Sequence, residues 1–408
     1  MPDRDQLLDA FAAGSLLRPD PTYMNVVDVV RGVASACGAE LPLDDHARAI
    51  AGHLRDARHI VLVLADGLGV RTVDALPRGS WLRRRMLRAI RAPFPTTTPV
   101  AITSLATGEY PARHAVLGWW THLAEIEAPV TVFAHERAVD GRRLDALDVA
   151  VETLLPGPRL FDRFTRDVAL IMPEGIVDSV FTRWMGGTGK RIGYRHQADF
   201  VDATVARVKQ ADGPTFTYLY TPMPDTVAHE AGMASPGAAA AVDALDGHLA
   251  AIEEALEDAR GGVRIVAVSD HGHLDIDPAA RLEVTEGDEL CQRLRVPPSG
   301  DLRTQYWHVK PGQGAAFEAA FRAGLGDHFL LLSNATVEEL GLLGPGVITD
   351  ATRQRMGQYL SVARDGAVMR YAGFPGRDGY LRMRSSHAGL TPAEVEVPLI
   401  LGGSGFAR

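Results

Sequence analysis

Short runs of strand-forming residues divide the chain, and each run ends in a turn that contains acidic, glycine or proline residues. The runs are Ile60–Ala65, Val168–Met172, Thr215–Tyr220 and Val263–Val268. A strand that is covered on both faces of a parallel sheet has such a continuous pattern, whereas a half-exposed strand alternates. Helical stretches such as Ala238–Ala259 separate the runs. Strands that alternate with helices predict a doubly wound α/β fold with a mostly parallel central sheet.

The segment 277–379 interrupts this alternation. It contains expected strands at 303–309 and 329–332 and an expected helix at 314–325, after which 397–401 supplies a last core strand. We interpret 277–379 as a small α+β cap inserted into the sheet. A chain of 408 residues is long enough for two or three domains. We therefore predict an N-terminal helical segment, 1–57, that packs on the core, a core formed by 58–276 and 380–408, and the cap, 277–379.

The bulk composition argues against several classes of protein. The formal net charge of −9 gives no indication of the basic surface that binds a nucleic-acid duplex. No apolar run reaches the roughly 18 residues of a membrane span, and the N-terminus lacks the pattern of a signal peptide. The two cysteines, Cys37 and Cys291, belong to no thiolate metal motif and are expected to be reduced. We expect a cytoplasmic protein without a membrane partner.

Acidic and histidine residues follow the expected strands. Asp66 comes directly after the first run, and Asp270 with His271 follows the fourth. Open α/β sheets bind their ligands at the carboxyl ends of strands. Asp225 and His229 are four residues apart, so one helical turn places them on the same face. Three carboxylates and three imidazoles are enough to hold two divalent metal ions. The candidate metal ligands are Asp66, Asp225, His229, Asp270, His271 and His387.

Each of these residues also has a simpler interpretation when it is taken alone. Asp66 after a strand is a common helix N-cap. The Asp225 and His229 pair fits a solvated helix start, because so short a motif often arises by chance. His387 fits an ordinary loop histidine in a Ser- and Gly-containing turn. The occurrence of all of them in one chain, at strand ends, favours the metal interpretation.

A hydroxyl-rich turn, Pro95–Pro99, precedes an expected helix at 99–107. Metal coordination is a known way to activate a hydroxyl as a nucleophile. Backbone N–H groups and the dipole at a helix start bind phosphate oxygens. Two metal ions neutralise the developing charge and stabilise the leaving oxygen. Together with the candidate ligands, this turn predicts a two-metal hydrolase that acts on phosphorus or sulfur esters.

The motifs resemble, in order along the chain, the type I phosphodiesterase/nucleotide pyrophosphatase family of the alkaline phosphatase superfamily. The resemblance covers about 58–275 and 380–403, and leaves the N-terminal segment and the cap without a recognised motif. It implies an alkaline phosphatase-like sheet and the hydrolysis of phosphodiester or pyrophosphate bonds. The matching segments are Leu64–Gly69, Phe94–Pro99, Thr107–Pro111 with His114, Pro224–His229, Ser269–Gly272 and Ser386–Gly389.

The resemblance also implies the roles of individual residues. The nucleophile of the family follows Pro-x-x, which selects Thr98, with Thr97 as the rival and Thr96 as a more distant third. The implied mechanism is in-line attack, a covalent phospho-threonine and its hydrolysis. Two divalent ions are implied, Zn²⁺ or Mn²⁺, since mixed Asp and His sites accept both. Asp225, His229 and His387 would hold one ion, and Asp66, Asp270 and His271 the other, with Thr98 bridging toward it.

The chain departs from the family pattern at one position. Nucleotide pyrophosphatases commonly carry a phosphate-contacting Asn shortly after the helix, where this chain has Trp119 and Trp120. These rings either stack on a base or fill an apolar core, so the preference for a nucleotide stays open. His273 is a further candidate, because a second histidine often orients a metal ligand. Candidate anion-binding residues are Arg113, Arg183, Lys190, Arg191, Arg382 and Arg384.

Other functions stay open at the level of the sequence. A phosphomonoesterase or a phosphonate hydrolase of the same superfamily would use the same ligands. A sulfatase is disfavoured, because its Cys/Ser-x-Pro-x-Arg motif is absent near residue 98. A non-catalytic metal-binding module of a larger assembly is the alternative outside enzymes. We expect a small phosphoester substrate, with a nucleotide as one candidate, and a monomer or homodimer.

Overall fold

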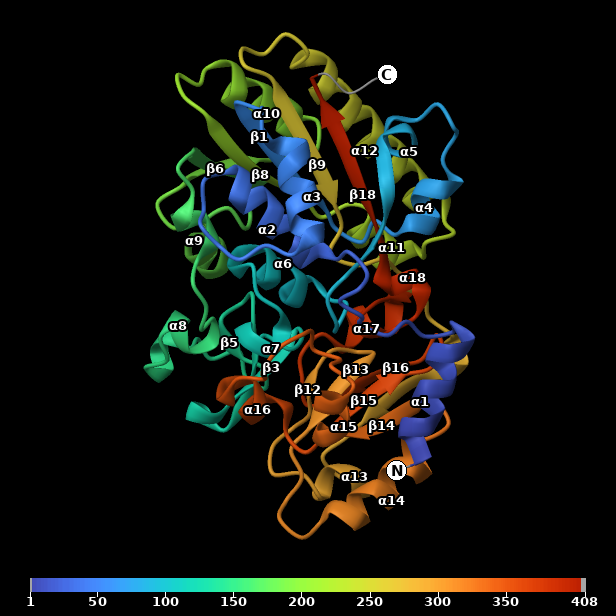
Figure 1. Cartoon of the computed structure of the whole chain (residues 1–408). Coiled ribbons are helices and arrows are strands. Elements are labelled where there is room, and N and C mark those ends of the chain that lie inside the picture. Colours follow the sequence, from blue (N-terminus) through green and yellow to red (C-terminus); the bar gives the residue numbers. More distant parts are fainter. Residues whose placement is uncertain (1, 405–408) are drawn as a thin grey trace.

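Two seven-stranded sheets organise the protein, the first in the upper half of Figure 1 and the second in the lower half. The computed structural model describes residues 2–404. In spatial order, the first sheet consists of β2 (Met86–Arg91), β18 (Glu396–Gly403), β9 (Val263–Val268), β1 (His59–Ala65), β8 (Thr215–Thr221), β6 (Asp167–Pro173) and β7 (Lys190–Tyr194). The second consists of β14 (Phe329–Ser333), β15 (Tyr359–Ala363), β13 (Thr304–Trp307), β12 (Ser299–Gly300), β3 (Trp120–Leu123), β4 (Ala128–Thr131) and β5 (Glu136–Arg137).

The first sheet confirms the predicted mixed α/β fold. Its strands β9, β1, β8, β6 and β7 are parallel, whereas β18 runs antiparallel to both β9 and β2. All seven residues of β1 are buried, as its continuous apolar run predicts. The edge strand β2 was not anticipated, because its sequence, Met-Leu-Arg-Ala-Ile-Arg, is half exposed and rich in arginine.

Helices cover both faces of this sheet. Ile60, Leu62 and Leu64 of β1 share one apolar core with α2 (Val26–Ala36), α3 (Asp45–Leu54) and α6 (Thr98–Thr107). The alternate residues Val61 and Val63 share another with α10 (Asp199–Lys209) and α12 (Pro236–Ala255). Successive side chains of a strand point to opposite faces. The central strand therefore carries two cores, as a doubly wound sheet requires.

The first helix, α1 (Pro2–Ala13), packs on the second sheet. Its Leu7 shares an apolar core with Leu330 of β14, and the Asp3 carboxylate accepts the backbone N–H of Leu331 at 2.9 Å. The N-terminal segment 1–57 thus divides between two surroundings, because α2 and α3 share the apolar core of the first sheet. An amphipathic helix shows which of its faces is buried, but it does not show which sheet covers that face.

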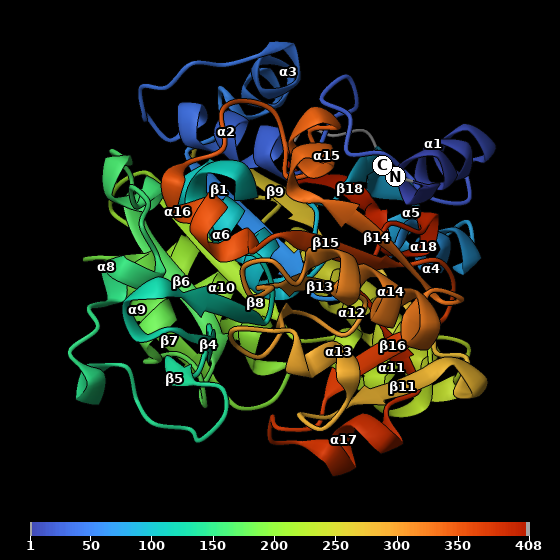
Figure 2. The ribbon, with the colours of Figure 1, turned by 90° about the horizontal axis from the view of Figure 1, so that it is seen from below.

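The second sheet is not built from the cap alone. Its strands β12 to β15 come from 277–379, but β3 to β5 come from 120–137, which the sequence assigned to the core. Gly118 and Gly300 allow the two segments to meet, since a Cβ atom at Gly118 would lie 2.4 Å from the carbonyl oxygen of Gly300. The second sheet therefore combines strands from both sides of residue 277. Figure 2 shows β13 to β15 lying over the strands of the first sheet.

Short elements complete the structure around these sheets. Among residues 2–404, no helix combines the length and apolarity that a membrane crossing needs.

The last four residues of the predicted core segment 380–408 lie outside the described residues. The remaining helices and strands include α4 (Val70–Ala75), α5 (Trp81–Arg85), α7 (Pro111–His114), α8 (Val151–Leu154), α9 (Val180–Gly186), α11 (Asp225–Ala231), α13 (Glu289–Gln292), α14 (Gly314–Leu325), α15 (Asn334–Glu339), α16 (Asp350–Met356), α17 (Arg377–Arg382), α18 (Pro392–Val395), β10 (Leu274–Asp275), β11 (Arg281–Val284), β16 (Val368–Tyr371) and β17 (Ser385–Ser386).

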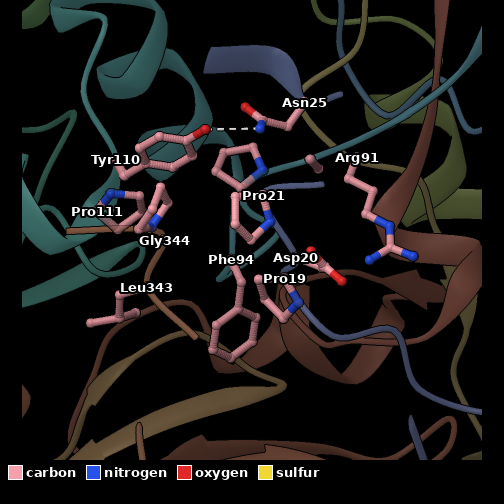
Figure 3. Close-up of a pocket in the computed structure, with 13 residues that line it drawn as sticks. Pro19, Asp20, Pro21, Asn25, Arg91, Phe94, Tyr110, Pro111, Leu343 and Gly344 are labelled. Carbon is pink, nitrogen blue, oxygen red and sulfur yellow. Dashed lines mark hydrogen bonds between the residues drawn. The ribbon is translucent and has the colours of Figure 1, made fainter. Parts of the chain in front are cut away.

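A small crevice marks the place where the N-terminal segment, the core and the cap meet (Figure 3). Phe94, Tyr110 and Leu343 line it, and the amide of Asn25 donates a hydrogen bond to the Tyr110 hydroxyl at 2.8 Å. Its volume is about 30 Å³. A cavity of this size holds a water molecule or two and excludes a phosphoester. The crevice is therefore a packing junction and not the substrate site.

Candidate metal centre

Three neighbouring parallel strands bring the predicted carboxylates together. Asp66 follows β1, Asp225 follows β8 at the start of α11, and Asp270 follows β9. Because β8 and β9 pair in parallel with β1 on either side, all three carboxylates lie at the same edge of the sheet. The backbone N–H of Asp225 donates to the carbonyl oxygen of Asp66 at 3.0 Å. Figure 1 places α6 and α11 at this edge, facing the second sheet.

The candidate side chains form two clusters that share one carboxylate. In each cluster, one potential ligand atom per residue lies within 4.8 Å of all the others. His271 Nε2 lies 3.5 Å from Asp66 Oδ1 and 3.4 Å from Asp270 Oδ2. All six predicted ligands therefore lie in the two clusters or next to them. The clusters are Asp225, His229, His273 and His387, and Asp66, Asp225 and His271.

Unpaired carboxylate oxygens mark the second cluster as suited to a cation. Among the described residues, neither Asp66 Oδ1 nor Asp270 Oδ2 has a hydrogen-bond partner, and both carboxylates are buried. A buried charge without a partner is costly, so such groups are paired or bind metals. The Tyr220 hydroxyl donates to the other oxygen of Asp66, Oδ2, at 2.6 Å. The oxygens that stay free are the ones that point toward His271.

The ring nitrogens of three histidines show a shared orientation. Nδ1 of His229 lies 2.8 Å from the carbonyl oxygen of Ser385, and Nδ1 of His271 lies 3.1 Å from that of Gly272. Nδ1 of His387 lies 3.1 Å from the carbonyl oxygen of Thr96. Metal-binding histidines usually donate their second ring nitrogen to a carbonyl or carboxylate, which fixes the tautomer. Here each ring keeps Nε2 available toward the cluster.

The electrostatics of the clusters agree with this arrangement. Burial, with the neighbouring Asp270 and Asp225, raises the pKa of Asp66 well above its usual value. Burial acts in the same direction on Asp225, but His229 and His273 outweigh it and lower its pKa. Burial and the neighbouring histidines lower the pKa of His387, which keeps its ring neutral, the form that binds metals. Crowded carboxylates with opposed pKa shifts are typical of functional sites.

The three threonine hydroxyls of the threonine turn, Pro95–Pro99, have different partners. Thr98 Oγ1 lies 3.2 Å from Nε2 of His271, inside the second cluster. The hydroxyl of Thr97 donates to Asp301 at 2.7 Å, and that of Thr96 donates to the carbonyl oxygen of Gly389 at 2.8 Å. Thr98 is the first residue of α6, with Pro99 in the first helical turn. Of the three hydroxyls, only that of Thr98 has a hydrogen bond to a predicted metal ligand within residues 2–404, whereas Thr96 meets His387 through its carbonyl oxygen.

Several sequence candidates have side chains that contact groups outside the two clusters or are exposed, although the backbone N–H of Arg384 donates to the carbonyl oxygen of His229 at 2.7 Å. Trp120 packs on Phe374 with ring centroids 4.8 Å apart, while Trp119 is 38% exposed and meets Phe133 edge-on. Four of the six candidate anion-binding residues contact nearby protein groups, and Arg382 and Arg384 are exposed. The four are Arg113, paired with Glu109, Arg183, bonded to the Asp178 carbonyl, Lys190, paired with Asp167, and Arg191, paired with Asp178.

Two residues near the site were missed at the level of the sequence. Tyr220 is the partner of Asp66, and its place near the end of β8 was the available signal. Asp301 lies in the cap, in a turn without a recognisable motif. His273, in contrast, has the predicted orienting position, because its Nε2 lies 2.7 Å from Asp225 Oδ1 and its Nδ1 lies 3.0 Å from the Ser385 hydroxyl.

The parallel sheet and the Asp and His clusters beside a buried threonine define a metal-dependent hydrolase of the α/β class. The family model of the type I phosphodiesterases/nucleotide pyrophosphatases matches residues 60–322. The chain belongs to this family. Comparison with curated protein sequences gave no match.

Solved structures share the fold. Murine ectonucleotide pyrophosphatase/phosphodiesterase 5 superposes with a TM-score of 0.61 at 14% identity, over 85% of this chain and 87% of that chain. An inactive variant of the murine protein in complex with AMP gives 0.60 at 14% identity, over 85% and 87%. The human protein also gives 0.60 at 14% identity, over 85% and 88%. The fold is thus alkaline phosphatase-like.

Proposed function

We propose that the protein is a two-metal hydrolase that cleaves phosphodiester or pyrophosphate bonds with Thr98 as the nucleophile. The observation that carries this proposal is the position of Thr98 Oγ1, 3.2 Å from His271 Nε2, next to carboxylate oxygens that lack a hydrogen-bond partner in the described part of the chain. Family membership supports phosphodiester hydrolysis as the reaction class. The hydroxyls of Thr96 and Thr97 are bonded elsewhere, which favours Thr98 over both.

The donor set fits two divalent ions, Zn²⁺ or Mn²⁺. Carboxylate and imidazole ligands suit both metals, and geometry decides between them. When bound, such ions lower the pKa of a coordinated hydroxyl and neutralise charge on the transferred group. Asp225, His229 and His387 would hold one ion, and Asp66, Asp270 and His271 the other, together with Thr98.

The residues of the chain then have defined parts in the reaction. Thr98 Oγ1 attacks phosphorus in line, so that the Oγ–P bond forms as the bond to the leaving oxygen breaks. Thr98 loses its hydroxyl proton, the leaving oxygen gains one, and water later hydrolyses the phospho-threonine. At the start of α6, Pro99 has no N–H, and the N–H groups of Val100 and Ala101 donate to the carbonyl oxygen of Thr97 at 3.1 Å, so the backbone N–H of Thr98 would be the donor toward a phosphate oxygen. The buried site limits the access of bulk water, which strengthens these interactions.

A small phosphoester, with a nucleotide as the leading candidate, is the substrate that we propose. The complex of the murine relative with AMP supports a nucleotide. The exposed indole of Trp119 belongs to the segment whose backbone contacts Asp301, close to the threonine turn. We also propose that the protein acts in the cytoplasm as a monomer or homodimer, without a membrane or a nucleic-acid duplex as partner.

A paired turnover assay tests the proposal. The protein with Zn²⁺ or Mn²⁺ receives bis-p-nitrophenyl phosphate and p-nitrophenyl phosphate in parallel reactions. We expect cleavage of the diester, which Thr98→Ala abolishes without loss of bound metal. Thr107→Ala, at the other end of α6, removes a hydroxyl that bonds the carbonyl oxygen of Thr103 and should retain turnover. Preference for the monoester, or full turnover by Thr98→Ala, would contradict the proposal.

A further inference from the structure

A turn of the cap contacts the threonine turn, Pro95–Pro99, of the core. Asp301 lies in this turn and is only 7% exposed. Its carboxylate accepts the hydroxyl of Thr97 at 2.7 Å, next to the proposed nucleophile, and the backbone N–H of Leu302 at 2.7 Å. The backbone of Trp119 also hydrogen-bonds to it. The cap therefore places an acidic group beside the threonine turn, where the sequence predicted none.

Neighbouring contacts hold this turn in place. The Asp301 N–H donates to the carbonyl oxygen of Thr304 at 2.6 Å, and the Thr304 hydroxyl donates to that of Ala388, also at 2.6 Å. The guanidinium of Arg303 donates to the buried carboxylate of Glu394 at 2.7 Å. Ala388 follows the proposed ligand His387 directly. The position of Asp301 relative to the metal centre is thus fixed by its bond to Thr97 and by the contacts through Thr304 to Ala388.

The hydrogen-bond partners of Asp301 are all donors, which is the arrangement that an ionised carboxylate accepts. Its partners are two backbone N–H groups and a hydroxyl, all of which can donate to it. Burial raises the pKa of Asp301 overall, and these hydrogen bonds with the charge of His229 oppose part of that rise. Within residues 2–404, no lysine or arginine is seen in an ion pair with it, and the adjacent Arg303 is paired with Glu394. Among the described residues, the carboxylate of Asp301 therefore has no lysine or arginine that pairs with it.

We propose that Asp301 is a specificity-determining residue, whose charge favours esters with one negative charge at phosphorus over esters with two. This inference rests on the proposed function of the same site. A phosphomonoester carries close to two negative charges above neutral pH, because its second pKa is about 6. A diester carries one. Coulomb repulsion grows with charge, so Asp301 repels a bound dianion twice as strongly as a monoanion at the same place. Repulsion of the wrong ligand is a common source of specificity.

The test uses two substrates that differ by a methyl group and a charge, methyl p-nitrophenyl phosphate and p-nitrophenyl phosphate. The ratio of kcat/KM for the diester to that for the monoester is measured at pH 8 with the metal-loaded protein. We expect Asp301→Asn to lower this ratio by about tenfold or more, because one buried negative charge is lost. Asp301→Glu keeps the charge and should keep the preference for the diester.

Two control variants separate charge from position. Thr97→Val removes the hydrogen bond but leaves the charge of Asp301 in place. Thr97→Val should lower kcat/KM for both esters by a similar factor and leave the ratio of the two values unchanged. Glu318→Gln neutralises a cap carboxylate that contacts Tyr359 and should change neither rate nor ratio. If Asp301→Asn does not fold, as judged by thermal unfolding, Asp301→Ser serves as the neutral variant.

The outcomes distinguish this inference from the proposed function. An unchanged ratio in the folded neutral variant would overturn the role of Asp301 while leaving the phosphodiesterase intact. An equal change of the ratio in Thr97→Val would also overturn it, since position and not charge would then decide. Wild-type protein that cleaves neither ester would instead contradict the proposed function.

Discussion

The Tyr220 hydroxyl donates a hydrogen bond to Oδ2 of Asp66 at 2.6 Å and leaves Oδ1 without a partner among the described residues. One oxygen of the carboxylate is thereby fixed by the protein, while the other faces His271. Hydrogen bonds of this kind orient metal ligands and tune their affinity. Tyr220 comes from β8, the strand that also leads to Asp225, so one strand supports both clusters.

We predict that Tyr220→Phe weakens metal binding by about 10- to 100-fold, the usual effect of removing such a partner. The affinity is measured by competition with a chelator. Tyr218→Phe is the matched control, because the Tyr218 hydroxyl is buried two residues away on the same strand and has no hydrogen-bond partner in the described structure. Equal affinities for the two variants would show that the hydroxyl of Tyr220 does not orient Asp66.

His273 should support the other cluster in a similar way. It connects Asp225 Oδ1 with the hydroxyl of Ser385. We predict that His273→Ala lowers the affinity for one of two metal ions by about 10- to 100-fold, since Asp225 loses its orienting partner. Isothermal titration resolves the two binding events. His248→Ala is a control, because His248 packs on Phe200, in the second apolar core of the first sheet. Loss of both ions together would contradict a role confined to one cluster.

The metal-free protein should show a pH dependence that originates at His229. Burial lowers the pKa of this ring, but the charge and hydrogen bond of Asp225 raise it more, so the net shift is upward. A raised folded-state pKa contributes stability that is fully present below the unfolded value of about 6.5 and is lost as the pH rises through the folded pKa. We expect thermal unfolding of the metal-free protein to show this loss, and His229→Gln to reduce it.

Metal binding should have the opposite pH dependence. A protonated His229 cannot act as a ligand, so metal affinity rises as the pH increases through the raised pKa. Affinities measured from pH 6 to pH 9 test this expectation. A metal affinity that stays constant over this range would argue against His229 as a ligand.

The ion pair between Arg303 and Glu394 should be essential for stability. Both side chains are almost fully buried, and Glu394 also accepts the N–H of Gly389 at 2.7 Å. We predict that Glu394→Ala destabilises the protein by about 3–5 kcal/mol, because it leaves the buried Arg303 without its anionic partner. Urea unfolding measures the loss. Arg353→Ala breaks a more exposed pair with Glu338 and should cost at most about 1 kcal/mol. Similar losses in both variants would contradict this explanation.

Much of the site was predictable because its signals are local in the sequence. Asp66 and Asp270 directly follow runs that form β1 and β9, and a parallel sheet brings such strand ends together. The helical spacing of Asp225 and His229 likewise appears in α11. The metal-ligand candidates therefore lie together in the structure, although their roles as ligands stay proposals.

The remaining features depend on contacts between distant segments. The short strands β3 to β5 pair within the second sheet through Gly300 and Trp120, a choice of partner that no local pattern encodes. The helix α1 has a buried face but no signal for the sheet that covers it. Asp301 lies in a turn, where neither strand nor helix periodicity applies, and only the folded cap brings it to Thr97.

The most direct test of the central proposal is to trap the covalent intermediate. The metal-loaded protein is mixed with bis-p-nitrophenyl phosphate and quenched in acid within one turnover, and its peptides are analysed by mass spectrometry. We predict a p-nitrophenyl phosphoryl group on Thr98, absent from Thr96 and Thr97 and absent when Thr98 is replaced by Ala. Modification of Thr97, or burst release of p-nitrophenol without any modified threonine, would contradict attack by Thr98.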